Sequence, residues 1–193
     1  QSRSSAASDV YKRQLLLRDP SHQALVMVPE INLTPQLEQR FVERFAPVYG
    51  EQAVVSMHSG MTPPQRLKSW LAAHAGTARI VLGTRMAVFA SMPGLRLIIV
   101  DEEHDPSYKQ QEGARYSARD MAVYRAHQES RHPDADGALQ PCRVLLGSAT
   151  PSLESWSACE RGRYRRLDMP SRIGAGDLPT VRRVDMNLSL IHI

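Results

Sequence analysis

The chain has 193 residues, of which 42% are hydrophobic and 23% charged, as expected for a globular protein rather than a disordered tail. It contains no apolar run of roughly 18 residues and no signal-peptide pattern, so we expect a cytoplasmic protein that does not enter a membrane. The net charge is +4, but residues 15–159 hold 14 basic and 15 acidic side chains, so charge alone does not indicate a nucleic-acid partner. The isolated cysteines Cys142 and Cys159 indicate neither a disulfide framework nor a zinc site.

The central part of the chain alternates between two patterns. Short apolar runs with almost no polar alternation predict strands that are buried on both faces, at residues 24–28, 53–57, 79–83, 97–101 and 143–147. Amphipathic stretches predict helices from Thr34, Thr62, Tyr116 and Thr150, and three of these begin with Thr-Pro, which favours Thr as the N-cap. This alternation predicts an α/β fold with a parallel sheet sandwiched by helices.

The two ends of the chain do not follow these patterns. Residues 1–14 are polar and aperiodic, and residues 187–193 form a short apolar tail, so we interpret both as adapter-like tails foreign to the folded protein. Residues 161–186 are basic and contain Pro and Gly, which is typical of a connection between domains. This interpretation leaves residues 15–160 as the folded unit and predicts that the chain is a fragment.

The strand at residues 97–101 runs into three acids and a histidine, Asp101, Glu102, Glu103 and His104. In parallel α/β sheets ligands bind beyond the carboxyl ends of the strands, which is where these side chains are expected. An acidic run alone could also be a solvated loop or a helix cap. However, polar segments also follow three other strands: "PEINLTPQ" (29–36), "TRMAVF" (84–89) and "SATPS" (148–152). We therefore predict a functional site at this edge of the sheet.

Taken together, these segments resemble helicase motifs. "VDEEH" resembles the Walker B box of DEAH-type helicases in superfamily two, "GSATPS" resembles motif III, "VPEINLTPQ" motif Ia and "GTR" the DNA-contacting motif. "HSGMTPPQRLKSWL" and "DEEHDPSYKQQEGARYSARD" are similar to the replication-restart helicases of the primosome, and the similarity covers roughly residues 15–185. The resemblance implies a RecA-like P-loop NTPase lobe in an ATP-dependent 3′–5′ DNA helicase that acts at stalled forks and promotes primosome assembly.

The same resemblance implies roles in ATP hydrolysis. Asp101 would hold magnesium beside the phosphates of ATP, Glu102 would activate the attacking water, and Glu103 and His104 would act as coupling residues. His104 is expected to reach Ser148 or Thr150 of motif III, close to the nucleotide. A surface histidine that caps a helix is the alternative for His104.

The resemblance also implies DNA contacts, mostly with the sugar-phosphate backbone. The tyrosines of the loop after the acids could stack on single-stranded bases, although Tyr116 could instead pack at its helix start and "HSG" could be an ordinary turn. The residues implied are Pro29, Glu30, Thr34, Gln36, His58, Ser59, Gly60, Gly83, Thr84, Arg85, Tyr108, Lys109, Gln110, Gln111, Arg115 and Tyr116.

A phosphate-binding Gly-Lys-Ser/Thr loop is absent from the sequence, although the family carries one before the strand expected at residues 24–28. We therefore expect a lobe that is truncated before its phosphate-loop strand and inactive as an isolated chain. The family's zinc-binding cysteines belong to the parent protein's second lobe, so no zinc is expected here. Expected partners are fork and single-stranded DNA, other primosome proteins and single-strand-binding protein. The alternatives are a metallohydrolase with Asp101, Glu103 and His104 as ligands, and a non-catalytic nucleic-acid-binding or primosome-docking module.

Overall fold

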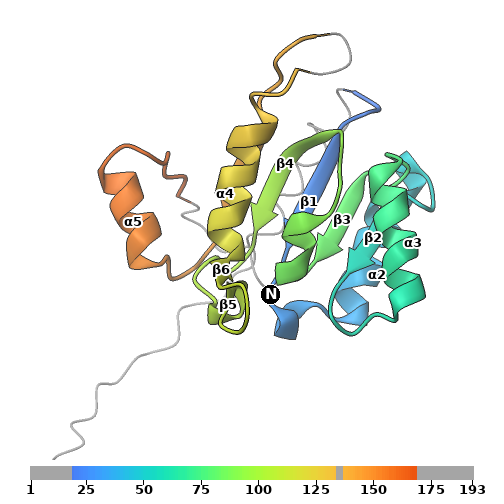
Figure 1. The fold of residues 1–193 in the computed structure, drawn as a ribbon, viewed down its shortest axis with the longest axis horizontal. Coiled ribbons are helices and arrows are strands. Elements are labelled where there is room, and N and C mark those ends of the chain that lie inside the picture. The colour runs from blue at the N-terminus through green and yellow to red at the C-terminus, as the bar shows by residue number, and fades with distance from the viewer. Residues whose placement is uncertain (1–18, 134–136, 169–193) are drawn as a thin grey trace, which may run out of the picture.

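Five parallel strands form the centre of the molecule, in the order β2-β3-β1-β4-β7. The computed structural model describes residues 19–133 and 137–168 (Figure 1). The strands are β1 Gln23–Met27, β2 Val54–Met57, β3 Ile80–Gly83, β4 Leu95–Val100 and β7 Arg143–Leu146. The predicted α/β fold with a parallel sheet is confirmed. The segments 1–14 and 187–193, and most of 161–186, lie outside the described residues.

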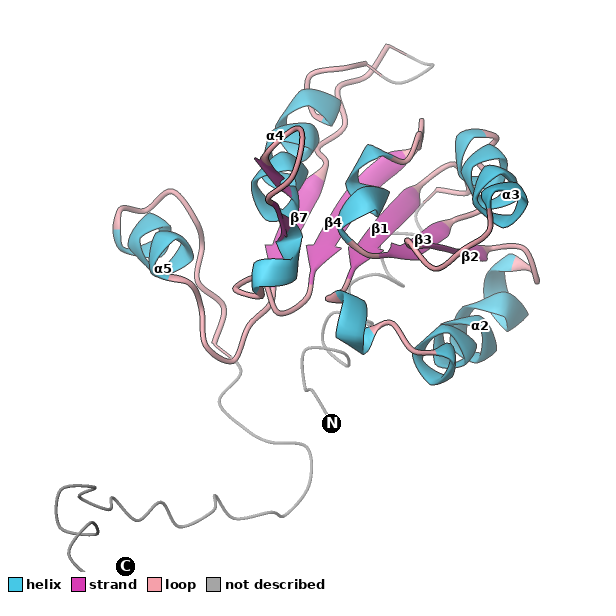
Figure 2. Ribbon diagram, turned by 60° about the horizontal axis from the view of Figure 1, so that its bottom comes forward, coloured by secondary structure: helices cyan, strands magenta, loops and turns pink. Residues whose placement is uncertain are grey.

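Helices cover both faces of this sheet (Figure 2). The helices α3 (Pro63–His74) and α4 (Ala118–Glu129) and the 3-10 helix η2 (Arg85–Phe89) pack on one face, and α2 (Pro35–Tyr49) packs on the other. The helix α5 (Leu153–Glu160) lies beyond the β7 side of the sheet. Two 3-10 turns, η1 (Glu30–Asn32) and η3 (Pro106–Tyr108), and the small hairpin of β5 (Lys109–Gln110) and β6 (Tyr116–Ser117) complete the described elements. None of the described helices has the length and hydropathy needed to cross a bilayer.

Two of the four predicted helix starts are confirmed, and two are shifted. The Thr34 side chain accepts a hydrogen bond from the backbone N–H of Leu37, and Thr62 is the N-cap of α3. The other two helices begin later than expected: α4 follows the N-cap Ser117 rather than starting at Tyr116, and α5 has Ser152 as its N-cap in place of Thr150. Thr150 does not cap a helix because its hydroxyl contacts His104, in the segment that follows β4, as described below.

Gln23 is a fully buried polar side chain that ties β1 to two neighbouring segments. Its Nε2 donates to the carbonyls of Ala73 and Ala78 at 2.8 and 2.7 Å, and its Oε1 accepts from the backbone N–H of Gly94 at 2.9 Å. Every hydrogen-bonding atom of the amide therefore has a partner.

We expect Gln23→Leu to lower the free energy of unfolding by about 3 kcal/mol, because it leaves the carbonyl of Ala78 and the N–H of Gly94 without a partner, while the carbonyl of Ala73 keeps its bond from Gly76. Urea-induced unfolding measures this loss, with Gln39→Leu on the exposed surface of α2 as the matched control. A loss no larger than that of the control would contradict the structural role given to Gln23.

Candidate active site

The acidic segment follows β4 and lies between the ends of β1 and β7, the two strands on either side of β4. The backbone N–H of Asp101 donates to the carbonyl of Met27 at the end of β1, at 2.9 Å. On the other side, the N–H of Gly147, just beyond β7, donates to Val100 at 2.8 Å, and the N–H of Glu103 donates back to Gly147 at 2.9 Å. These hydrogen bonds fix the backbone of the acids at the carboxyl edge of the sheet, the position expected from the sequence.

Asp101 carries an unusual atom, because its Oδ1 is buried and has no hydrogen-bond partner among the described residues. A buried carboxylate oxygen without a partner is costly, so its environment is suited to an additional ligand such as a cation or a cation-bound water. Mg²⁺ is usually held by one or two carboxylates together with waters and phosphate oxygens of the substrate. Asp101 thus fits the role of magnesium ligand that the resemblance to helicase motifs implies.

Glu102 has a strained backbone. Its φ of 47° is the only positive φ of a non-glycine residue in the described part of the chain, and such a conformation costs about 1 kcal/mol or more. Its carbonyl accepts from the N–H of Asp105 at 2.8 Å, and its partly exposed carboxylate lies 3.6 Å from Nδ1 of His104. Conformations of this kind cluster at active sites, where the surrounding structure holds them in place.

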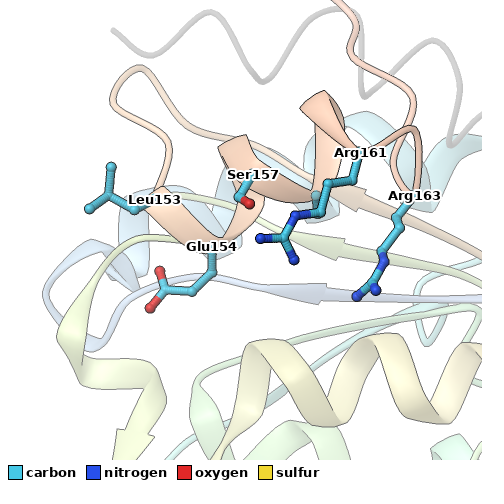
Figure 3. Close-up of a pocket in the computed structure, with 6 residues that line it drawn as sticks. Leu153, Glu154, Ser157, Arg161 and Arg163 are labelled. Atoms are coloured by element: carbon cyan, nitrogen blue, oxygen red, sulfur yellow. The ribbon is translucent and has the colours of Figure 1, made fainter.

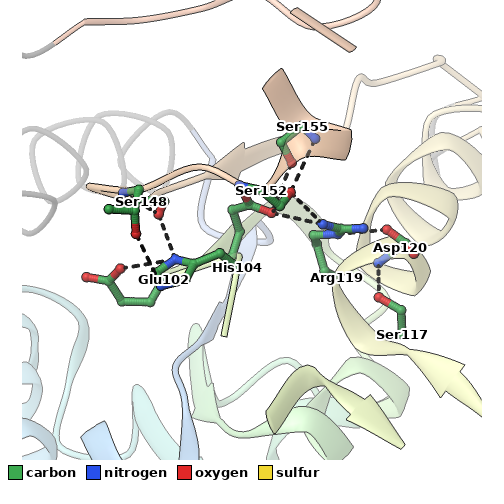
Figure 4. Close-up of polar contacts among 10 residues, drawn as sticks. Glu102, His104, Ser117, Arg119, Asp120, Ser148, Ser152 and Ser155 are labelled. Atoms are coloured by element: carbon green, nitrogen blue, oxygen red, sulfur yellow. Dashed lines mark hydrogen bonds and ion pairs between the residues drawn. The ribbon is translucent and has the colours of Figure 1, made fainter. Parts of the chain in front are cut away.

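His104 connects the acids to the end of β7 (Figure 4). Its Nδ1 lies 2.8 Å from the hydroxyl oxygen of Ser148, and its Nε2 lies 3.3 Å from that of Thr150. The predicted contact between His104 and the "SATPS" segment is therefore present, with both ring nitrogens engaged. Which nitrogen donates depends on the tautomer.

Glu103 is the centre of a buried polar cluster, the Glu103 cluster, formed by Glu103, Arg119, Ser152 and Ser155. Figure 4 shows Arg119, Ser152 and Ser155 close together. Its Oε1 accepts from the N–H of Ser152 at 2.7 Å, and its Oε2 accepts from the hydroxyls of Ser152 and Ser155 and from Nη1 of Arg119 at 2.9–3.1 Å. Burial alone would raise the pKa of Glu103, but these hydrogen bonds outweigh it and hold the pKa below its usual range. Glu103 therefore stays ionised and anchors the start of α5.

This arrangement does not favour the metallohydrolase alternative. Glu103, one of its three proposed ligands, is engaged by Arg119 and two serines, and His104 is engaged by two hydroxyls. Within residues 19–133 and 137–168, no group of three His, Cys, Asp or Glu side chains is placed to hold a metal ion.

Several of the residues expected to contact DNA are exposed near the same edge of the sheet. The hydroxyl of Ser59 donates to Oε1 of Glu30 at 3.2 Å, so the segments after β1 and β2 meet, and His58 lies 3.7 Å from Glu38. Lys109 and Arg115 belong to the loop after the acids. The exposed members of the predicted set are Glu30, Thr34, Gln36, Ser59, Gly60, Lys109, Gln111 and Arg115, while His58 and Gln110 are half-buried.

Other members of that set lie in the interior, which conflicts with the predicted DNA contacts. Pro29 and Thr84 are buried, and a Cβ on Gly83 would lie 2.5 Å from the carbonyl oxygen of Met57, so Gly83 is needed for close packing. Tyr108 is 1% exposed, so a base cannot stack on its ring in this conformation.

Two further members of the set have partners within the protein. The ring of Tyr116 makes an edge-on contact with Phe89 at 5.1 Å between centroids, which fits the packing alternative. Arg85 donates to two backbone carbonyls of the loop after the acids.

Two pockets lie near the start of α5. One is lined by eleven residues that include His104, Lys109, Arg119 and Thr150, and it adjoins the acids. The other lies on α5 itself, where Arg161 and Arg163 approach from the C-terminal side of the helix (Figure 3). Glu103 and His104 line the first pocket, whereas none of the residues from Asp101 to His104 lines the pocket on α5. We therefore place the candidate active site at the strand end.

Sequence reasoning missed the partners of Glu103. One signal was present, since Arg119 lies in the first turn of α4, where the helix dipole disfavours a cation and nearby carboxylates offset that cost. Ser152 and Ser155 are 49 and 52 residues away from Glu103 along the chain, and their pattern in the sequence is that of an ordinary helix start.

The sequence profile of DEAD/DEAH box helicases matches residues 6–157, so the chain belongs to the DEAD/DEAH box helicase family. Within this family it is a homologue of replication restart protein PriA. It is 42% identical to the Bacillus subtilis protein over 168 residues, which are 87% of this chain and 19% of that protein. It is 45% identical to the Haemophilus influenzae protein over 152 residues, which are 79% of this chain and 19% of that protein. The chain thus spans about a fifth of the length of these curated relatives.

The solved structures show the same fold at low sequence identity. The DUF1998 helicase MrfA bound to DNA and AMPPNP matches with a TM-score of 0.57 and 11% identity, over 86% of this chain and 21% of MrfA. The expected RecA-like helicase lobe is therefore confirmed as the fold.

Proposed function

We propose that the chain is part of the motor of a longer replication-restart helicase, which couples ATP hydrolysis to 3′–5′ unwinding of DNA at stalled forks and promotes primosome assembly. The observation that carries this proposal is the pair Asp101 and Glu102 at the end of the interior strand β4, with His104 in contact with the hydroxyls of Ser148 and Thr150 just beyond β7. The homology to replication restart protein PriA supports the assignment to fork DNA.

In the proposed reaction each acid has a separate task. The free Oδ1 of Asp101 would hold the magnesium ion that accompanies ATP, and that ion would neutralise charge on the phosphates. Glu102, which is partly exposed beside it, would accept the proton of the water that attacks the γ-phosphate. His104, Ser148 and Thr150 would keep the ends of β4 and β7 together during the reaction.

DNA would run along the exposed edge formed by the segments after β1 and β2 and by the loop after the acids. Lys109 and Arg115 supply positive charge there, and contacts with phosphates give affinity without reading sequence. Single-strand-binding protein and other primosome proteins are the proposed partners of the longer protein.

Unwinding of forked DNA by the full-length protein tests this proposal. We expect strand separation that requires ATP and magnesium and a single-stranded 3′ tail on the loading strand. The 193-residue chain by itself should show no ATP turnover, since no glycine in it is followed by the lysine of a phosphate-binding loop. DNA binding by the full-length protein without any ATP turnover would favour the non-catalytic binding module.

A further inference from the structure

The turn that follows the acids is held by side chains from two directions. Tyr108, in η3, is 1% exposed, and its hydroxyl donates to the backbone carbonyl of Asp101 at 2.7 Å. Arg85 is the first residue of η2, which follows β3 and Thr84. Its Nη1 donates to the carbonyls of Ser107 and Lys109 at 3.0 and 3.3 Å. These two carbonyls belong to the residues on either side of Tyr108.

Both sets of contacts support the peptide bond between Asp101 and Glu102, directly through Tyr108 and indirectly through Arg85. The carbonyl that accepts from Tyr108 is part of this peptide, so the hydrogen bond fixes the orientation of the peptide plane directly before the strained residue. A positive φ at a glutamate persists only where neighbouring groups determine it. Within the described structure, the hydroxyl of Tyr108 is such a group.

The hydroxyl of Tyr108 is a dependable donor. A backbone carbonyl can only accept a hydrogen bond, so the buried hydroxyl of Tyr108 must be the donor to Asp101. Arg85 in turn fixes the backbone that carries the ring, because a guanidinium that bridges two carbonyls restrains both. A chain of direct contacts thus runs from the end of β3 to the backbone of Glu102.

We propose that Arg85 and Tyr108 form a brace that keeps Glu102 in its geometry for ATP hydrolysis, so that both are positioning residues rather than DNA contacts. The inference rests on the proposed function, in which Glu102 activates water. It differs from the sequence-based expectation for both residues, because it predicts an effect on turnover and not on DNA affinity.

The test uses the full-length protein with Tyr108→Phe, which removes only the hydroxyl and keeps the buried ring, and Arg85→Gln. The matched controls are Tyr124→Phe and Arg131→Gln, both at exposed positions outside the site. We expect each brace variant to lower kcat for ATP at saturating DNA about 10-fold, because Tyr108→Phe removes the hydrogen bond to the Asp101–Glu102 peptide and Arg85→Gln removes the bonds that hold Tyr108 in place. The KM for ATP and the Kd for forked DNA should change by less than about 2-fold, as for a loss confined to the hydrolysis step.

The double variant separates a shared brace from two unrelated effects. If both residues act through the Asp101–Glu102 peptide, the double variant should lose little more than the stronger single variant. An unchanged kcat in Tyr108→Phe would overturn the proposal. So would an Arg85→Gln variant with weakened DNA binding and a normal kcat at saturating DNA, because Arg85 would then be a DNA contact.

Amide hydrogen exchange tests the brace independently of activity. Exchange in peptides that cover residues 99–105 should become faster in both brace variants and remain unchanged in the controls, because the turn loses an anchor. If the wild-type protein showed no DNA-stimulated hydrolysis, the proposed function would fail, and this measurement would still decide the brace. Unchanged exchange in Tyr108→Phe and Arg85→Gln would contradict it.

Discussion

Replacement of Glu102 by Gln in the full-length protein should lower ATP turnover by a factor of about 10² to 10⁴ and leave ATP affinity almost unchanged. The substitution keeps the size and shape of the side chain and removes only its ability to accept a proton. The carboxylate of Glu102 is partly exposed, and within the described residues its one close charged neighbour is Nδ1 of His104 at 3.6 Å, so little else in the structure depends on its charge.

The measurement is steady-state ATP hydrolysis together with nucleotide binding, and Glu51→Gln, at an exposed position before β2, is the matched control. Loss of ATP binding in Glu102→Gln would show that Glu102 supports the structure of the site. A turnover close to that of the wild type would assign the proton transfer to another group.

Replacement of Arg119 by Met should destabilise the fold by about 3–5 kcal/mol, because it leaves the carboxylate of Glu103 buried without its counter-ion. The side chains of Arg119 and Glu103 are 11% and 2% exposed, so water cannot easily replace the lost partner. Because Glu103 also binds Ser152 and Ser155, the loss should loosen α5 as well. Urea-induced unfolding measures the effect, with the exposed Arg131→Met as the control, and a loss equal to that of the control would refute this account.

The same cluster predicts a dependence on pH. The folded-state pKa of Glu103 lies below its value of about 4.3 in an unfolded chain, so its ionised form stabilises the fold above that pH. The contribution disappears as the pH falls through the lower, folded-state pKa. The difference in unfolding free energy between wild type and Glu103→Gln should therefore be constant near neutral pH and shrink below about pH 4. A difference that stays constant down to pH 2 would contradict the assignment.

The strands of the sheet could be predicted from the sequence because each one is encoded by a short continuous run of apolar residues. Runs such as Leu97–Val100 are apolar at every position, and this pattern has few solutions other than a strand buried on both faces. The position of Asp101 and Glu102 followed directly, since the end of a parallel strand determines where the next residues lie. The contact of His104 with Ser148 was implied by the resemblance to helicase motifs, and the structure brings the two together because they follow the adjacent strands β4 and β7.

The contacts that could not be predicted depend on tertiary structure. Nothing local distinguishes Tyr108, in a polar segment, from an exposed loop tyrosine, yet the fold buries it and turns its hydroxyl to Asp101. Likewise, Thr150-Pro151 has the pattern of a helix start, but Thr150 is held by His104, and the helix begins only after Ser152. In both cases, hydrogen bonds between distant segments outweigh local preference.

The central claim, that the strand-end acids belong to a DNA-driven motor, is tested most directly by the ATPase rate of the full-length protein as forked DNA is titrated in the presence of magnesium. The account predicts a low rate without DNA and a saturable increase with DNA, and both should vanish in Glu102→Gln. A rate that is independent of DNA, or one that survives in Glu102→Gln, would contradict it.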